Sequence, residues 1–255
     1  MTTRNDPLPA AATAEREPAL VSLQDIRDAA ARLRGITVRT PLLRFGRPVL
    51  GDPRGETRGY LKPENLQPIG AFKLRGAYNA IAQLTADERL HGVVAHSSGN
   101  HAQGVARAAR LLGVAATIVM PRNAPRLKVA GVEGDGARIV TVSDDPEERA
   151  SRAAELAVAD GRTLVPPFDD ARVVAGQGTI GLEIVEQIAE LDGDEPPEPL
   201  TVLVPIGGGG LAAGVAAAVK SLRPDARVFG VEPELAADAR DSLREGRIVR
   251  WEPRD

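Results

Sequence analysis

The sequence predicts an α/β protein built from open parallel sheets that are covered by helices. Two observations predict this class. Short apolar runs alternate with longer helical stretches along most of the 255-residue chain, and such alternation is typical of parallel strands joined by helices. Glycine or small polar residues follow several of the apolar runs, as they do where a strand leads into a helix. The length allows one large domain or two smaller ones.

The first helix is predicted to begin at Ser22. Asp25 stands three residues later, so the pair resembles a capping box, in which two side chains satisfy free amide groups of the first turn. An apolar stripe at helical spacing continues this helix to Gly35. A short strand at 60–62 and a helix at 71–84 follow.

Beyond this helix the order of strand, turn and helix repeats. The runs at strand positions are short and largely apolar, as expected of strands that are buried on both faces. We therefore expect strands at 93–95, 116–120, 137–142, 163–165, 201–205 and 227–231. Helices are expected at 101–112, 125–132, 146–158, 176–191 and 211–222.

Composition argues against several functional classes. The 35 acidic and 32 basic residues give a net charge of −3, which makes no electrostatic case for nucleic acid or an anionic membrane as partner. The chain has no cysteine, so disulfides, thiolate metal sites and a cysteine nucleophile are excluded. No apolar run is long enough to predict a transmembrane helix. Residues 1–20 lack the apolar core of a secretory signal, so we expect a disordered tail and a cytoplasmic protein.

Four consecutive glycines, Gly207 to Gly210, lie between a predicted strand and a predicted helix. Glycines let backbone N–H groups approach an anion without obstruction by side chains, and the following helix adds free N–H groups and the positive end of its dipole. The turn therefore suits a phosphate, although a tight structural turn has the same pattern. It is not a P-loop, because Leu211 and Ala212 stand where that motif has lysine and a hydroxyl residue.

A second strand-to-helix turn is Ser97-Ser98-Gly99-Asn100-His101. Its polar groups suit a carboxylate or a ring oxygen, although a serine there is equally a helix cap. A third motif places Lys73 among apolar neighbours near a helix start. Such a lysine is usually solvated, but burial would lower its pKa and make it a nucleophile or a base. Together the three motifs meet the needs of pyridoxal-phosphate (PLP) chemistry.

The residues of these motifs and their order resemble those of the serine/threonine dehydratases and serine racemases, which are fold-type II (tryptophan-synthase-β-like) PLP enzymes. The segment KPENLQPIGAFKLRGA at 62–77 is similar to their lysine motif, and GQGTIGLE at 176–183 to a characteristic helix start. SSGNHAQGV at 97–105 and GGGGL at 207–211 are similar to their carboxylate and phosphate loops. The resemblance implies two open parallel-sheet, three-layer domains with PLP in the cleft between them.

The resemblance also implies a role for each matching residue. Lys73 would hold PLP as an imine, Phe72 would lie against the pyridine ring and Asn100 would bond the ring hydroxyl. The phosphate would be held by backbone N–H groups of Gly207, Gly208, Gly209, Gly210 and Leu211. The substrate carboxylate would be held by Ser97, Ser98, Gly99, Asn100 and His101. In the racemase branch, the serine at position 98 is the acid/base on the opposite ring face.

The segment EPELAAD at 232–238 resembles the divalent-cation site of serine racemases and related dehydratases. There the carboxylates at Glu232 and Asp238 and the carbonyl at Ala236 would bind Mg²⁺ or Mn²⁺, which favour oxygen ligands. Taken on its spacing alone, the segment is equally a solvated acidic loop.

The implied reaction is a β-elimination. Lys73 would remove the Cα proton as general base, the β-hydroxyl would leave, and L-threonine or L-serine would yield a 2-oxo acid and ammonia. A serine or aspartate racemase and a 3-hydroxyaspartate dehydratase are alternatives, because racemisation and elimination share the first proton transfer. A PLP-binding relic without turnover and a nicotinamide-binding Rossmann protein are alternatives from other classes.

The resemblance finally implies a domain division and a homodimer. We expect a small domain at 92–168 and a large domain that combines 21–91 with 169–255. In the family, a further C-terminal segment supplies the hydroxyl or thiol group that bonds the pyridine nitrogen, and these 255 residues do not include it. We therefore expect a C-terminally truncated large domain with part of its apolar core exposed, and poor solubility or weak activity.

Overall fold

The computed structural model describes residues 20–44, 57–192 and 199–251. The predicted disordered tail lies outside these residues, apart from Leu20. The first elements are α1 Leu23–Arg32, β1 Leu43–Arg44, β2 Tyr60–Leu61, η1 Glu64–Leu66, α2 Lys73–Ala82, α3 Ala86–His91, β3 Val93–His96, α4 Asn100–Leu112, β4 Ala116–Pro121 and α5 Arg126–Gly134. The later elements are β5 Arg138–Val142, α6 Pro146–Asp160, β6 Thr163–Leu164, α7 Ala171–Asp192, β7 Thr201–Pro205, α8 Gly210–Leu222, β8 Arg227–Val231, η2 Glu234–Ala236 and α9 Asp238–Glu245.

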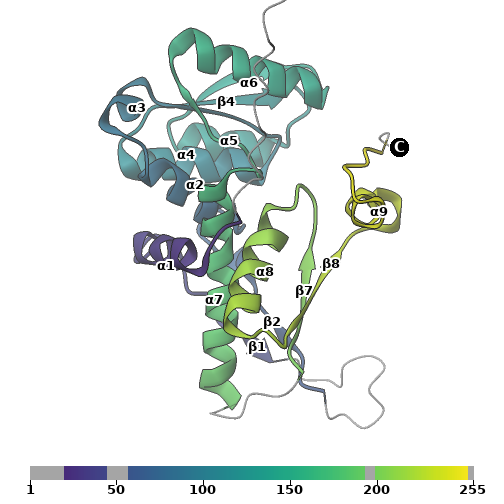
Figure 1. Cartoon of the computed structure of the whole chain (residues 1–255). Coiled ribbons are helices and arrows are strands. Elements are labelled where there is room, and N and C mark those ends of the chain that lie inside the picture. Colours follow the sequence, from purple (N-terminus) through teal and green to yellow (C-terminus); the bar gives the residue numbers. More distant parts are fainter. Residues whose placement is uncertain (1–19, 45–56, 193–198, 252–255) are drawn as a thin grey trace, which may run out of the picture.

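The largest described sheet has four parallel strands in the order β5-β4-β3-β6. Because successive side chains of a strand point to opposite faces, Val93 and Ile118 join one apolar core while Val94 and Val119 join another. Helices α2, α4 and α5 cover the first face and α6 covers the second, which makes three layers (Figure 1). The predicted α/β class with parallel sheets is confirmed.

A second parallel pair, β7 and β8, packs against α7 and α8. Val202 and Val204 point into that core, whereas Leu203 and Phe229 lie on an open face and are 67% and 51% exposed. A third pair, β1 and β2, is short and antiparallel. Strand β2 matches the strand predicted at 60–62, whereas β1 and the antiparallel pairing were not predicted.

The four-stranded sheet is drawn from residues 93–164, which fall within the small domain predicted at 92–168. Helix α2 precedes that range, yet its residues Leu74, Ala77 and Ile81 belong to the core on one face of the sheet. The apolar core therefore continues across residue 92, and the domain division stays a prediction.

Helix α7 begins at Ala171, five residues before the predicted start at Gly176. The prediction was wrong because glycine was taken as a helix boundary, whereas the glycines lie inside the helix at close helix contacts. A Cβ on Gly176 would lie 2.6 Å from the backbone of Arg75 in α2, and one on Gly178 would lie 2.9 Å from the carbonyl oxygen of Gly214 in α8. These glycines let α2 and α8 approach α7 from two sides.

In the part of the chain that the structure describes, no helix is both long enough and apolar enough to cross a membrane.

Candidate active site

Lys73 is the first residue of α2, and its half-buried side chain reaches back over the preceding turn. The amine Nζ donates a hydrogen bond of 2.7 Å to the carbonyl oxygen of Pro167 and lies 5.3 Å from the centre of the Phe72 ring. Burial lowers the pKa of this amine from 10.5 to about 8, because an ammonium loses hydration when it is buried. The neutral amine is therefore far more accessible near neutral pH than in an exposed lysine.

The turn after β3 leads into α4 without a side-chain cap. Gly99 is the N-cap residue, and the Ser97 hydroxyl accepts a hydrogen bond from the Gly99 N–H group at 3.1 Å. Ser98 and Asn100 are at least partly exposed, and Asn100 Oδ1 accepts a 2.6 Å hydrogen bond from Lys128. The alternative in which a serine simply caps this helix is not the observed arrangement, so the first amides of α4 lack a side-chain partner.

His101 follows in the same turn, and its ring is buried. Nε2 lies 2.9 Å from the carbonyl oxygen of Val165. Because a carbonyl oxygen only accepts hydrogen bonds, Nε2 carries the hydrogen and Nδ1 is an acceptor. Burial lowers the pKa of His101 to about 3, so the ring is neutral at pH 7. The His101 side chain thus links α4 to the residue after β6. The contact of His101 with a substrate carboxylate, as predicted, would therefore be made by its backbone N–H group.

The glycine turn joins β7 to α8, and its residues face in two directions. A Cβ on Gly207 or Gly209 would meet open space within 4 Å, whereas one on Gly208 would overlap the ring of Phe168. Gly209 is the N-cap residue of α8 at a φ of 84°, which favours glycine, and no side chain caps this helix. One side of the turn therefore lies against Phe168, and the other side has free space beside Gly207 and Gly209.

The three helices that begin in this region lack side-chain caps, as does α5, whose N-cap residue is Pro125. Helices α2, α4 and α8 begin at Phe72, Gly99 and Gly209 without a cap from a side chain. By contrast, side chains of Ser22 and Thr85 cap α1 and α3. Uncapped N-termini leave amide donors for an anion, so the two turns suit a phosphate and a carboxylate.

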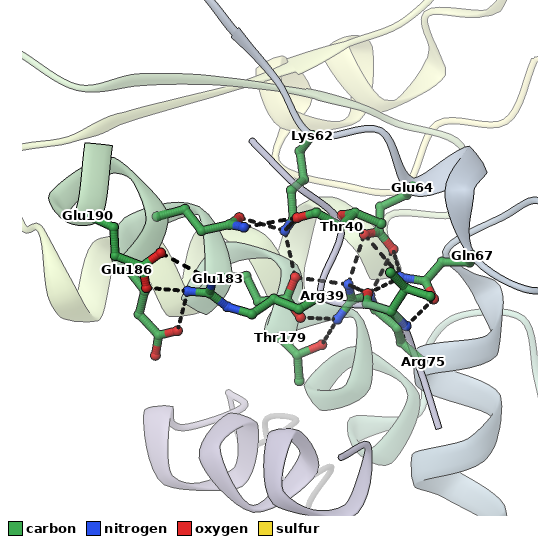
Figure 2. A network of polar contacts seen from close by, with 12 residues as sticks. Arg39, Thr40, Lys62, Glu64, Gln67, Arg75, Thr179, Glu183, Glu186 and Glu190 are labelled. Carbon is green, nitrogen blue, oxygen red and sulfur yellow. Dashed lines mark hydrogen bonds and ion pairs between the residues drawn. The ribbon is translucent and has the colours of Figure 1, made fainter. Parts of the chain in front are cut away.

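A network of polar contacts, which the sequence patterns did not predict, is centred on Arg75 of α2 (Figure 2). The guanidinium of Arg75 is 1% exposed and pairs with the carboxylates of Glu64 and Glu183 at 2.8 and 2.6 Å. Burial alone would lower the pKa of Arg75, but the two carboxylates raise it above its ordinary value. Lys62 donates to Glu183, Gln187 and the Thr40 carbonyl group.

Comparison with known proteins shows the family of this chain. A family model described as pyridoxal-phosphate dependent enzyme matches residues 33–255. The chain belongs to this family. Curated PLP-family relatives include the L-threo-3-hydroxyaspartate ammonia-lyase of Saccharomyces cerevisiae, 45% identical over 88% of this chain and 66% of that protein. The L-threonine ammonia-lyase of Thermotoga maritima is 44% identical over 91% of this chain and 55% of that protein.

Solved structures of PLP-family relatives have the same fold. The T.th. threonine deaminase is 46% identical with a TM-score of 0.81, and the match covers 91% of this chain and 71% of that one. Maize serine racemase is 37% identical with a TM-score of 0.84, over 93% of this chain and 69% of that one. The chain spans 55 to 66% of the length of the curated relatives described above.

The residues of the three turns fit PLP. The open side of the glycine turn and the uncapped start of α8 suit its phosphate, and the Lys73 amine suits its aldehyde. Phe72 lies beside that amine. Asn100, whose amide oxygen already accepts from Lys128, is held at the start of α4. The individual roles of these residues stay predictions.

The predicted cation segment has another role in this structure. Both carboxylate oxygens of Glu232 accept backbone N–H groups at the start of α9, from Ala239 at 3.1 Å and Arg240 at 2.9 Å. The described residues contain no group of three or more acidic or histidine side chains placed to hold a metal ion. The predicted site has only two carboxylates and a backbone carbonyl group, so metal binding at Glu232, Ala236 and Asp238 stays a prediction.

Proposed function

We propose that this chain carries the catalytic machinery of a PLP-dependent ammonia-lyase that converts L-threonine or L-serine to a 2-oxo acid and ammonia. The observation that carries the proposal is the Lys73 amine, which has a lowered pKa and is joined through Pro167 and Phe168 to the glycine turn. The names of the relatives support the substrate class, since they include a threonine ammonia-lyase and a hydroxyaspartate ammonia-lyase.

In this proposal each of the two uncapped turns binds one anion. Amides of Gly207 to Leu211 hold the cofactor phosphate, and the turn from Ser97 to His101 holds the substrate carboxylate. Phe72 and Asn100 orient the pyridine ring and its hydroxyl. When bound, PLP supplies an electron sink for the electron pair that the Cα–H bond leaves behind.

Lys73 then acts on the substrate as a general base. With a pKa of about 8, its neutral fraction at pH 7 is on the order of a hundredfold larger than that of a lysine with an ordinary pKa. Nζ takes the proton from Cα, and the β-hydroxyl leaves as water. The enamine product tautomerises to an imine, and addition of water to this imine releases ammonia, so that L-threonine yields 2-oxobutanoate and L-serine yields pyruvate.

The experiment that tests the proposal incubates the chain and PLP with L-threonine, L-serine or 3-hydroxyaspartate and measures 2-oxo acid and ammonia. We expect equal amounts of both products, and none from Lys73→Ala. Borohydride should fix PLP to Lys73 in the wild-type protein. Fixed cofactor without product release would contradict the lyase activity and favour a PLP-binding relic. Cofactor binding that survives Lys73→Ala unchanged would contradict the role of the lysine.

Racemisation is the second candidate function, because Ser98 lies in the carboxylate turn and is not buried, so it could exchange a proton on the face opposite Lys73. A relative of known structure, the serine racemase of Dictyostelium discoideum, is 38% identical over 90% of this chain. Chiral chromatography of the serine recovered after incubation decides between the two reactions. Ser98→Ala should remove D-serine formation while leaving 2-oxo acid release from L-serine largely intact.

Divalent-cation binding by Glu232, the Ala236 carbonyl and Asp238 is a further part of the proposal. It requires Glu232 to exchange at least one amide hydrogen bond at the start of α9 for the ion. The test measures thermal unfolding with added Mn²⁺. We expect the melting temperature to rise with the wild-type protein and with Glu234→Gln, but not with Glu232→Gln. An equal rise in all three proteins would argue against this site.

The proposal also includes the small domain at 92–168, a homodimer and a cytoplasmic location. Limited proteolysis tests the division, analytical ultracentrifugation the oligomeric state and cell fractionation the location.

A further inference from the structure

Six residues link β6 to α7, and the first four of them, Val165 to Phe168, contact each of the three predicted site motifs. The Val165 carbonyl oxygen lies 2.9 Å from Nε2 of His101 in the carboxylate turn. The Pro167 carbonyl oxygen accepts from Lys73 Nζ at 2.7 Å. The ring of Phe168 lies where a side chain on Gly208 would stand. No other stretch as short links these three motifs among the hydrogen bonds and glycine contacts of the described residues.

Both ends of this segment are fixed. The N–H group of Val165 donates to the Val94 carbonyl group at 2.9 Å, which extends the pairing of β6 with β3. At the other end, Asp169 has a φ of 55° and is the one non-glycine residue with positive φ among the described residues. Asp170 then accepts the Arg172 N–H group at 2.8 Å at the start of α7. The backbone between these ends, with prolines at 166 and 167, has little freedom to shift.

Phe168 determines which side of the glycine turn is open. Side chains on Gly208 and Gly210 would face Phe168, at overlap for the first and at 3.2 Å from its Cβ for the second. Gly207 and Gly209 face open space. The aromatic side chain thus lies against alternate residues of the turn and leaves free space beside the other two.

The Pro167 carbonyl group has a matching effect on Lys73. A carbonyl oxygen only accepts, so this bond uses an N–H of the amine and leaves the lone pair of the neutral form free. The lone pair is what attacks an aldehyde or takes a proton.

We infer that residues 165–168 are a positioning segment, in which Phe168 sets the conformation of the glycine turn for a phosphate and the Pro167 carbonyl group aims the Lys73 amine. Phe168 is a positioning residue, because it acts through Gly208 and Gly210. The inference rests on the proposed cofactor site but not on the reaction that follows.

The test is a double-mutant cycle on PLP binding, with the dissociation constant measured from the absorbance spectrum of the bound cofactor and no amino acid present. We expect Gly208→Ala to weaken binding at least tenfold, because the new methyl group overlaps the Phe168 ring. Phe168→Ala should weaken binding several-fold by releasing the turn. In the double variant the overlap is gone, so adding Gly208→Ala to Phe168→Ala should cost little more.

Additive losses in the double variant would overturn the inference, since the methyl group would then obstruct the phosphate itself. Phe229→Ala removes an exposed ring of β8 and should leave binding unchanged. Where Phe168→Ala fails to fold, Phe168→Leu replaces it in the cycle. The pH dependence of borohydride fixation gives an independent readout, and Phe168→Ala should leave it unchanged because the Pro167 carbonyl group remains.

The outcomes also separate this inference from the proposed function. Non-additive binding in a protein that releases no 2-oxo acid would support the positioning segment and contradict the lyase activity. Additive losses in a protein with full turnover would contradict the positioning segment alone. A wild-type chain that does not bind PLP would contradict both.

Discussion

The two parallel sheets described in this protein differ in how they are covered. All six residues of β4 are buried, because helices lie on both faces of the four-stranded sheet. In β7, buried and exposed residues alternate, and β8 is mostly exposed. The sequences of β4 and β7 are both apolar, so apolar composition alone does not reveal whether one face or two faces of a strand are covered.

The open face of the β7–β8 pair carries Leu203, Phe229 and Val231. Parallel strands usually have both faces covered, so this exposed apolar surface is unusual for a parallel pair. The comparison predicts that equal substitutions in the two sheets have unequal costs.

The largest effect is expected at Arg75, whose guanidinium is 1% exposed although it is charged. Arg75→Leu removes the cation beside Glu64 and leaves Glu183 paired with Lys62 alone, which should lower the free energy of unfolding by about 3–5 kcal/mol. Urea denaturation measures this loss. The matched control is Arg39→Leu, whose exposed pair with Glu190 should contribute less than about 1 kcal/mol. Equal losses would show that burial does not decide the cost.

The next effect concerns the centre of the covered sheet. Ile118 is fully buried in β4, so Ile118→Ala should cost about 2–5 kcal/mol through lost burial and a cavity. Leu203→Ala on the open face should change stability by no more than about 0.5 kcal/mol. Chemical denaturation of both variants tests the contrast, which fails if Leu203→Ala costs as much as Ile118→Ala.

A smaller effect of opposite sign is expected at Lys73. Its folded pKa of about 8 lies below the ordinary value of 10.5, so the folded state bears the cost of a buried cation at neutral pH. Without PLP, Lys73→Met should stabilise the protein by roughly 1–2 kcal/mol below pH 8. Between pH 8 and 10.5 the unfolded wild-type chain binds more protons than the folded one, so wild-type stability rises and the advantage shrinks. Thermal unfolding of both proteins across this pH range measures the stability difference between them. A difference that grows with pH would contradict the lowered pKa of Lys73.

The smallest effect is expected from a charge on the open face. Leu203→Lys should change stability by no more than about 0.5 kcal/mol and should increase solubility, because it interrupts an exposed apolar patch. Val202→Lys, on the covered face of the same strand, should prevent folding. Sedimentation and circular dichroism check the pair. Loss of folding in Leu203→Lys would mean that this face is covered in solution.

Local patterns predicted most of the elements. The bounds of β7 and β8 match the predicted strands, and the capping box at Ser22 and Asp25 is present. The same pattern at Thr85 and Glu88 begins α3, which was missed although its signal is in the sequence. Capping and strand composition depend on neighbours in the chain, which explains why they can be read locally.

Contacts between distant segments could not be predicted in this way. Arg75 meets Glu183 across more than a hundred residues, and Phe168 meets Gly208 across forty. Nothing in the local sequence of either partner specifies the other. The three turns were predicted as separate motifs, but the segment from Val165 to Phe168 that brings them together carries no local signal of that role.

The glycines inside α7 have a mechanical consequence. Gly176 lets α2 rest directly on the α7 backbone, and Gly178 does the same for α8 (Figure 1). The lysine begins one of these helices and the glycine turn begins the other. Both helices therefore pack directly on α7. A rigid movement of α7 would carry the Lys73 amine and the glycine turn together and would preserve the distance between them.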